Sequence, residues 1–171
     1  MYQGGGCNIL SMAGGEDTRQ SLRLAATFMA NHREWFKTWL KVEVKMLPET
    51  ESLSIHTWAW TLNNGINGSS GGVVLLLAML QCMAPALRVI PRVACTGTIS
   101  LAGQVGHVDG AEAKIKVAHE AGIQRCLVPR AVYDNLASDF IENVTGRRQD
   151  GSCMKLMPVE NVLEVLTHAM T

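Results

Sequence analysis

A glycine-rich turn that leads directly into a long apolar segment constrains the fold of this chain more than any other feature. Residues 67–72 read Asn-Gly-Ser-Ser-Gly-Gly, and residues 73–80 are all apolar. A helix that is apolar on every side is buried in a core. We therefore expect a helix over residues 70–83, ended near Pro85, that other parts of the chain enclose.

Helical and strand-like patterns alternate on both sides of this segment. Upstream, residues 18–40 repeat at helical spacing, and residues 42–46 and 53–62 have the composition of strands. Downstream we expect a strand over 92–100, a hairpin into 104–108, a helix over 111–120 closed by Gly122, a strand over 124–128, a helix near 130–138, a strand over 154–157 and a helix over 159–170. This order predicts a mixed α/β (α+β) single domain over residues 18–171, with an N-terminal arm or short strand over residues 1–17.

The amino-acid composition limits the classes of partner that we expect. Lys and Arg total 15 and Asp and Glu total 15, so the net charge is zero and nothing predicts binding to nucleic acid. The longest apolar run is too short for a membrane span, so we expect no membrane insertion. Residues 1–6 lack a charged region followed by an apolar stretch, so we expect no secretory leader.

The cysteines indicate a reducing compartment, either cytoplasmic or the mitochondrial matrix. They are odd in number and form no C-x-x-C motif. Cys82, Cys95 and Cys126 fall inside apolar segments, which predicts buried free thiols. The five histidines do not pair with cysteines at ligand spacing, so we expect no metal site.

The serines of residues 67–72 allow two interpretations. Amides at the start of a helix point outward and favour negative charge, which suits a nucleophile facing an oxyanion site. A serine at this position can equally be an N-cap on a core helix. These six residues decide neither between the two roles nor between Ser69 and Ser70.

A longer motif downstream favours the nucleophile. Residues 96–105 read Thr-Gly-Thr-Ile-Ser-Leu-Ala-Gly-Gln-Val, a turn at Asp109-Gly110 leads to Lys114, and residues 118–123 read Ala-His-Glu-Ala-Gly-Ile. This pattern closely resembles the proteolytic domain of Lon proteases. The resemblance covers roughly residues 18–170, and residues 67–72 match the family's serine box.

The resemblance implies a serine endopeptidase with a Ser-Lys dyad. Ser70 matches the catalytic serine, Lys114 the catalytic lysine, and Thr96 the threonine that orients the lysine. The backbone of Gly68, Ser69 and Ser70 would then form the turn that binds the oxyanion.

The chemistry of such a pair sets a requirement on the lysine. A serine hydroxyl needs a base at hydrogen-bond distance. A lysine amine is protonated in water, and burial among apolar neighbours favours its neutral form. Because small and apolar residues surround Lys114 in the sequence, we expect it to be partly desolvated.

Residues in and before the serine box give weaker indications of a substrate groove. Trp58, Trp60 and Asn67 could line a substrate groove, although alternating aromatic residues on a strand are at least as often core residues. Asn67 stands where the family has aspartate and Ser69 where it has proline, while Thr98 replaces a frequent glutamate. These departures suggest a divergent member of the family.

The resemblance also implies partners. Substrates would be peptides or unfolded proteins, no cofactor would enter proteolysis, and the chain could assemble into a homo-oligomer, commonly a hexameric ring. The chain has no G-x-x-x-x-G-K-[ST] box, so ATP would act only through a separate ATPase domain. Two alternatives are a polyprotein-processing protease of the birnavirus type, and a non-catalytic Lon-like domain for oligomerisation or binding.

Overall fold

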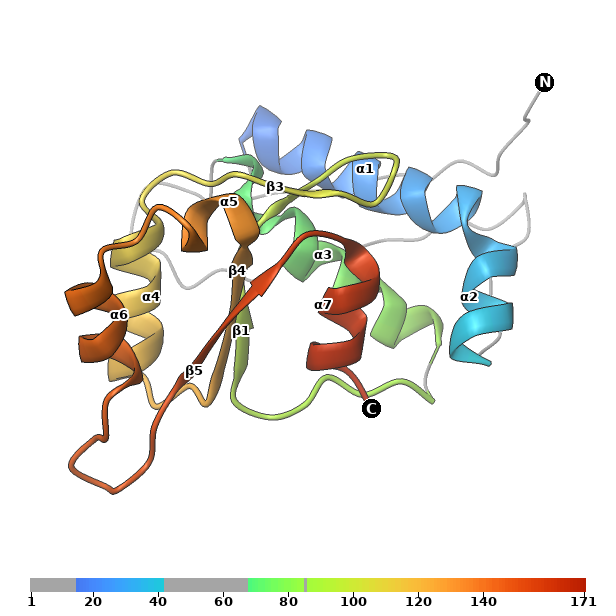
Figure 1. The fold of residues 1–171 in the computed structure, drawn as a ribbon. Coiled ribbons are helices and arrows are strands. Elements are labelled where there is room, and N and C mark those ends of the chain that lie inside the picture. Colours follow the sequence, from blue (N-terminus) through green and yellow to red (C-terminus); the bar gives the residue numbers. More distant parts are fainter. Residues whose placement is uncertain (1–14, 42–67, 85) are drawn as a thin grey trace.

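The computed structural model describes residues 15–41, 68–84 and 86–171, and Figure 1 shows their arrangement. The helices in chain order are α1 (Glu16–Asn31), α2 (Arg33–Leu40), the 3-10 turn η1 (Ser69–Gly71), α3 (Gly72–Met83), α4 (Ala111–Glu120), α5 (Arg130–Tyr133), α6 (Ser138–Thr145) and α7 (Val162–Ala169). The strands are β1 (Val93–Cys95), β2 (Thr98–Ile99), β3 (Val105–Gly106), β4 (Arg125–Pro129) and β5 (Lys155–Val159). The mixed α/β class predicted from the sequence is confirmed.

A parallel sheet with the order β1-β4-β5 forms the centre of the described part. Ala94 lies opposite Cys126, and Cys126 lies opposite Leu156. Strands β2 and β3 form a separate antiparallel hairpin in which Ile99 pairs with Val105. All three parallel strands therefore end on the same side of the molecule, at the top in Figure 1.

Helices cover both faces of this sheet (Figure 1). On one face α1, α3 and α7 pack around a core that includes Leu76 and Leu127. On the other face α4 and α6 enclose a smaller cluster that includes Ile115, Cys126 and Val128. Leu127 and its two neighbours on β4 supply opposite clusters because successive strand residues point to opposite faces.

Helix α3 is the apolar helix expected from the sequence. Leu76 and Leu80 are fully buried on it. Its exposed positions recur every fourth residue, at Val74, Ala78 and Cys82. The prediction that Cys82 is buried is therefore wrong, because an apolar neighbourhood in sequence does not fix which side of a helix a residue occupies.

Several helix and strand boundaries differ from those expected from the sequence. The helix expected over 18–40 is two helices separated at His32, whose φ of −110° is not helical. The strand expected over 92–100 is interrupted between β1 and β2, and the last helix begins at Val162. The helix expected near 130–138 is the short α5, and α6 follows as a helix that the sequence reading missed.

Other expectations fall where the structure gives no description. The strands expected over 42–46 and 53–62 lie outside the described residues, as does most of the arm over residues 1–17. Among the described residues, no helix combines the length and the apolarity that crossing a membrane requires.

Candidate active site

Ser70, Thr96 and Lys114 line one pocket with a volume of about 250 Å³. These three residues come from three elements: η1, the segment that follows β1, and α4. The remaining lining residues are small or apolar: Gly68, Gly71, Val74, Ala94, Cys95, Ile115, Ala118 and Cys126. The pocket therefore combines three polar groups with a largely apolar wall.

Backbone hydrogen bonds fix the position of Ser70 relative to Thr96. The Ser70 carbonyl accepts from the Gly97 amide at 2.9 Å and from the Thr96 hydroxyl at 3.4 Å. The Gly97 carbonyl in turn accepts from the Val73 amide at 3.1 Å. The start of α3 is thus bound directly to the segment between β1 and β2, which explains why the expected strand is interrupted there.

Two glycines permit this close approach. A Cβ atom on Gly72 would lie 3.2 Å from the Ile99 amide nitrogen. A Cβ atom on Gly97 would lie 2.6 Å from Val105 Cγ1 and 3.0 Å from Val73 Cγ2. All three distances are shorter than an ordinary van der Waals contact, so a larger residue at either position would force its neighbours to move.

Ser69 and Ser70 differ in their surroundings. Ser69 is exposed and does not line the pocket, and its carbonyl accepts from the Ser21 hydroxyl on α1 at 3.3 Å. Ser70 is half-buried and lines the pocket. Gly68, which precedes both serines, has a φ of +119°, a conformation that favours glycine. The turn thus presents Ser70, and not Ser69, to the pocket.

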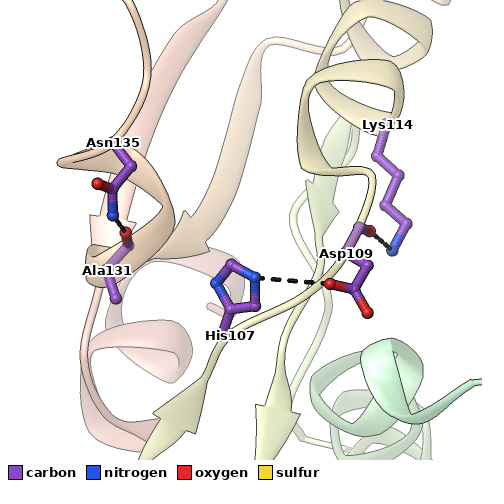
Figure 2. A network of polar contacts seen from close by, with 5 residues as sticks. All are labelled: His107, Asp109, Lys114, Ala131 and Asn135. Carbon is purple, nitrogen blue, oxygen red and sulfur yellow. Dashed lines mark hydrogen bonds and ion pairs between the residues drawn. The ribbon is translucent and has the colours of Figure 1, made fainter.

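Lys114 lines the pocket from the first turns of α4. Its side chain folds back along the helix, and Nζ donates a hydrogen bond to the Asp109 carbonyl at 3.0 Å (Figure 2). The Asp109 carboxylate also lies 3.7 Å from His107 Nε2. Lys114 is exposed, so the partial desolvation expected from its sequence neighbours is absent here. Within the described part of the chain no hydrogen bond joins Lys114 to Ser70.

Two thiols form part of the apolar wall. Burial, together with the nearby Cys126, raises the pKa of the Cys95 thiol to about 12. Burial raises the pKa of Cys126 to about 11. Both side chains are therefore neutral at physiological pH, which keeps the floor of the pocket uncharged.

Neither thiol was among the site residues expected from the sequence. Cys95 precedes Thr96 directly, so its position next to the motif was a usable signal. Cys126 lies at the pocket because β1 and β4 pair in parallel. No local sequence pattern predicts this pairing. Trp58, Trp60 and Asn67, the other groove candidates, lie outside the described residues.

Comparison with known proteins yields one family and several named relatives. The family model described as "Lon protease (S16) C-terminal proteolytic domain" matches residues 10–171. The archaeal Lon protease of Methanothermobacter thermautotrophicus is 31% identical over 122 residues, covering 71% of this chain and 18% of the relative. The Lon protease of Citrifermentans bemidjiense is 31% identical over 164 residues, covering 95% of this chain and again 18% of the relative. The chain thus spans less than a fifth of the length of these relatives.

Proposed function

Because this chain belongs to the family of Lon protease (S16) C-terminal proteolytic domains, we propose that it is a serine endopeptidase with Ser70 as nucleophile and Lys114 as general base. The observation that carries this proposal is the shared pocket, which Ser70, Thr96 and Lys114 all line. A peptide carbonyl that enters this pocket meets a hydroxyl, an amine and helix-start amides together. The relatives named Lon protease favour this proposal over a viral processing protease.

In the proposed reaction, the Ser70 hydroxyl attacks the scissile carbonyl while the neutral Lys114 amine takes its proton. Backbone N–H groups of the Gly68–Ser70 turn stabilise the oxyanion, each worth roughly 10²–10³ in rate. Lys114 then protonates the leaving amine. Water hydrolyses the acyl-enzyme with Lys114 again acting as base, and no metal or organic cofactor takes part.

The hydrogen bond from Lys114 to Asp109 implies a movement before catalysis. The amine must leave the Asp109 carbonyl and turn toward Ser70. The Lys114 side chain is exposed, so no packed neighbours hold it in its present conformation. A substrate that fills the apolar pocket would exclude water from the amine and favour its neutral form. Thr96, buried beside Ser70, would then hold the amine in place.

Substrate and assembly follow from the same proposal. We expect extended peptide segments as substrates, since a protease must hold the main chain of its substrate. We also propose that the chain forms a homo-oligomer, with a hexameric ring as the first possibility to test. ATP hydrolysis would belong to a separate domain.

Replacement of the base tests the proposal. Lys114→Ala should abolish cleavage of an unstructured protein substrate, whereas Lys116→Ala, an exposed lysine on the same helix, should leave cleavage unchanged. Turnover retained by Lys114→Ala would contradict the assignment.

A further inference from the structure

Two of the three polar residues that are buried in the described part of the chain contact the serine turn before α3. The three residues are Thr18, Ser21 and Thr96. The Ser21 hydroxyl donates to the Ser69 carbonyl at 3.3 Å, and the Thr96 hydroxyl donates to the Ser70 carbonyl at 3.4 Å. Burying a hydroxyl costs free energy unless it is hydrogen-bonded. The proposed reaction uses Thr96 but gives no role to Ser21.

Ser21 lies on the face of α1 that packs against α3. Ala25 and Phe28 follow it on this face at helical spacing, and both are buried in the core that contains Leu76. Ser21 itself is only 2% exposed and lies in the part of α1 that contacts η1. Figure 1 shows the first turns of α1 beside the start of α3. A side chain without a polar group would fit this apolar face at a lower cost, so the reason for a hydroxyl must lie in the bonds that it makes.

The Ser21 hydroxyl shares its proton between two carbonyls. One belongs to Asp17, a turn earlier on α1, at 2.9 Å, and the other belongs to Ser69 at 3.3 Å. The bond to Asp17 is one that serine and threonine commonly make inside helices. Thr145 on α6 makes the same kind of local bond, to the Ile141 carbonyl at 2.7 Å. The bond to Ser69 joins α1 to another element, so it is the one that acts on the serine turn.

The peptide groups on both sides of Ser70 are anchored by hydrogen bonds. The Ser69 carbonyl accepts from the Gly72 amide within the turn and from the Ser21 hydroxyl. The Ser70 carbonyl accepts from the Gly97 amide at 2.9 Å. Because a peptide group is planar, anchoring the groups before and after a residue fixes its φ and ψ. The direction of the Ser70 side chain is therefore set by α1 on one side and by the segment after β1 on the other.

The bond from Ser21 also sets the direction of the Ser70 amide. In a trans peptide, the carbonyl of one residue and the N–H of the next point in opposite directions. Because the Ser69 carbonyl is bound toward α1, the Ser70 N–H points away from α1. The start of a helix leaves amides at this position without an intrahelical acceptor, and the proposed function counts this amide among the oxyanion donors. Such a donor is effective only when it is held within about 3 Å of the oxyanion.

We propose that Ser21 is a positioning residue for the nucleophile, and that it acts by fixing the peptide group between Ser69 and Ser70. This inference rests on the proposed function, because it needs Ser70 as nucleophile and its amide as an oxyanion donor. Ser21 is not among the described residues that line the pocket, so it acts through Ser70 and not on the substrate. Without its hydroxyl, the Ser69 carbonyl keeps the Gly72 amide as a donor, so the turn should still form but should be held less firmly.

Steady-state cleavage of fluorescently labelled casein separates positioning from folding. Ser21→Ala should lower kcat about tenfold and leave KM unchanged, because a misdirected amide weakens binding of the transition state and not of the substrate. The matched control Thr145→Val removes the same kind of local hydroxyl bond from α6 and should leave both constants unchanged. Alanine is favourable inside a helix, so Ser21→Ala should fold. Should it fail to fold, Ser21→Cys keeps a similar volume with a weaker donor and should show a smaller loss of kcat.

Hydrogen exchange of the Gly72 amide tests the positioning without relying on proteolysis. This amide donates to the Ser69 carbonyl, which Ser21 also holds. Ser21→Ala should make it exchange about fivefold faster, the factor that corresponds to the loss of one hydrogen bond. The Leu166 amide on α7 should keep its rate in this variant, and Gly72 should keep its rate in Thr145→Val.

Three results would overturn the proposal: an unchanged exchange rate of Gly72 in Ser21→Ala, an unchanged kcat in that variant, or a loss of kcat that Thr145→Val shares. Failure of the proposed function would look different, because the unaltered chain would not cleave casein or Ser70→Ala would still cleave it. The catalytic role of Ser21 would then fall with the proposed function, while the exchange of Gly72 would still decide whether Ser21 holds the turn.

Discussion

Gly97 lies where the serine turn contacts the segment that leads into the hairpin of β2 and β3. It has two roles there: its amide binds the Ser70 carbonyl, and its missing side chain leaves room for Val73 and Val105. Gly71, in the turn η1, lines the Ser70 pocket and has open space where a Cβ would be placed. Gly71 therefore provides a matched control for a substitution at Gly97.

Substitution by alanine should change the free energy of unfolding differently at these two glycines. Gly97→Ala should lower the free energy of unfolding by about 1–3 kcal/mol, because the added methyl group overpacks the contact. Gly71→Ala, whose φ of −85° suits any residue, should be neutral or slightly stabilising. Urea denaturation measures both, and an equal loss in the two variants would contradict the packing argument.

The pocket thiols should make stability depend on pH. Burial raises the pKa of Cys95 to about 12 and of Cys126 to about 11, above the ordinary value of 9.0. Since the folded state favours the neutral thiols, their contribution is complete below about pH 9 and is lost as the pH rises toward 11–12.

Urea midpoints taken between about pH 7 and pH 10.5 would measure this loss. The double variant Cys95→Ala, Cys126→Ala should be less stable at every pH but should show a flatter decline above pH 9. A decline of unchanged steepness in the double variant would assign the pH dependence to other groups.

At the scale of elements, α7 shows how a cap defines where a helix begins. Asn161 accepts from the Glu164 amide at 3.0 Å, and the Glu164 carboxylate accepts from the Glu160 amide at 2.8 Å. These bonds satisfy donors that the helix itself leaves unpaired. The helix expected from residue 159 therefore starts at Val162 instead.

Removal of this cap should be measurable. Asn161→Ala should lower the free energy of unfolding by about 1 kcal/mol, because the Glu164 amide loses its acceptor. Asn143→Ala, at an exposed position on α6, should change it by less than about 0.5 kcal/mol. Thermal unfolding followed by circular dichroism makes this comparison, and equal effects would rule out the capping role.

The elements that could be predicted from the sequence are those with strong local signals. Helix α4 was expected over its observed range because Asp109-Gly110 precedes it and Gly122 closes it. The structure gives Gly122 a φ of +76°, which suits a glycine at a helix end. Helix α6 was missed because, within its eight residues, only Val144 is buried, which leaves little periodicity to detect.

The site shows the same division between local and long-range information. Ser70, Thr96 and Lys114 were predicted together because their motifs are recognisable in sequence, and they do line one pocket. The bond from Lys114 to the Asp109 carbonyl depends on a side-chain conformation that the sequence does not specify. The position of Cys126 depends on strand pairing, which is equally absent from local patterns.

At the scale of the whole molecule, the sheet separates two apolar clusters that stabilise one fold. Leu76 on α3 belongs to one cluster, and Ile115 on α4 belongs to the other. Strand β4 contributes alternate residues to both clusters, so loosening either cluster should loosen the central strand. We therefore expect the two clusters to unfold together.

Truncation of each cluster tests this cooperativity. Leu76→Ala and Ile115→Ala should each cost about 2–5 kcal/mol while keeping a single unfolding transition. Val117→Ala removes a side chain that is 62% exposed on α4 and should cost less than about 0.5 kcal/mol. Two separate transitions, followed by circular dichroism and tryptophan fluorescence, would show that the layers unfold independently.

We propose that the turn before α3 presents Ser70, and not Ser69, as the nucleophile. The rate of peptide-bond cleavage in an unstructured protein, measured with either serine replaced, tests this assignment. Ser70→Ala should abolish cleavage, whereas Ser69→Ala, at the exposed position outside the pocket, should retain it. Cleavage that survives in Ser70→Ala would show that Ser70 is not the nucleophile.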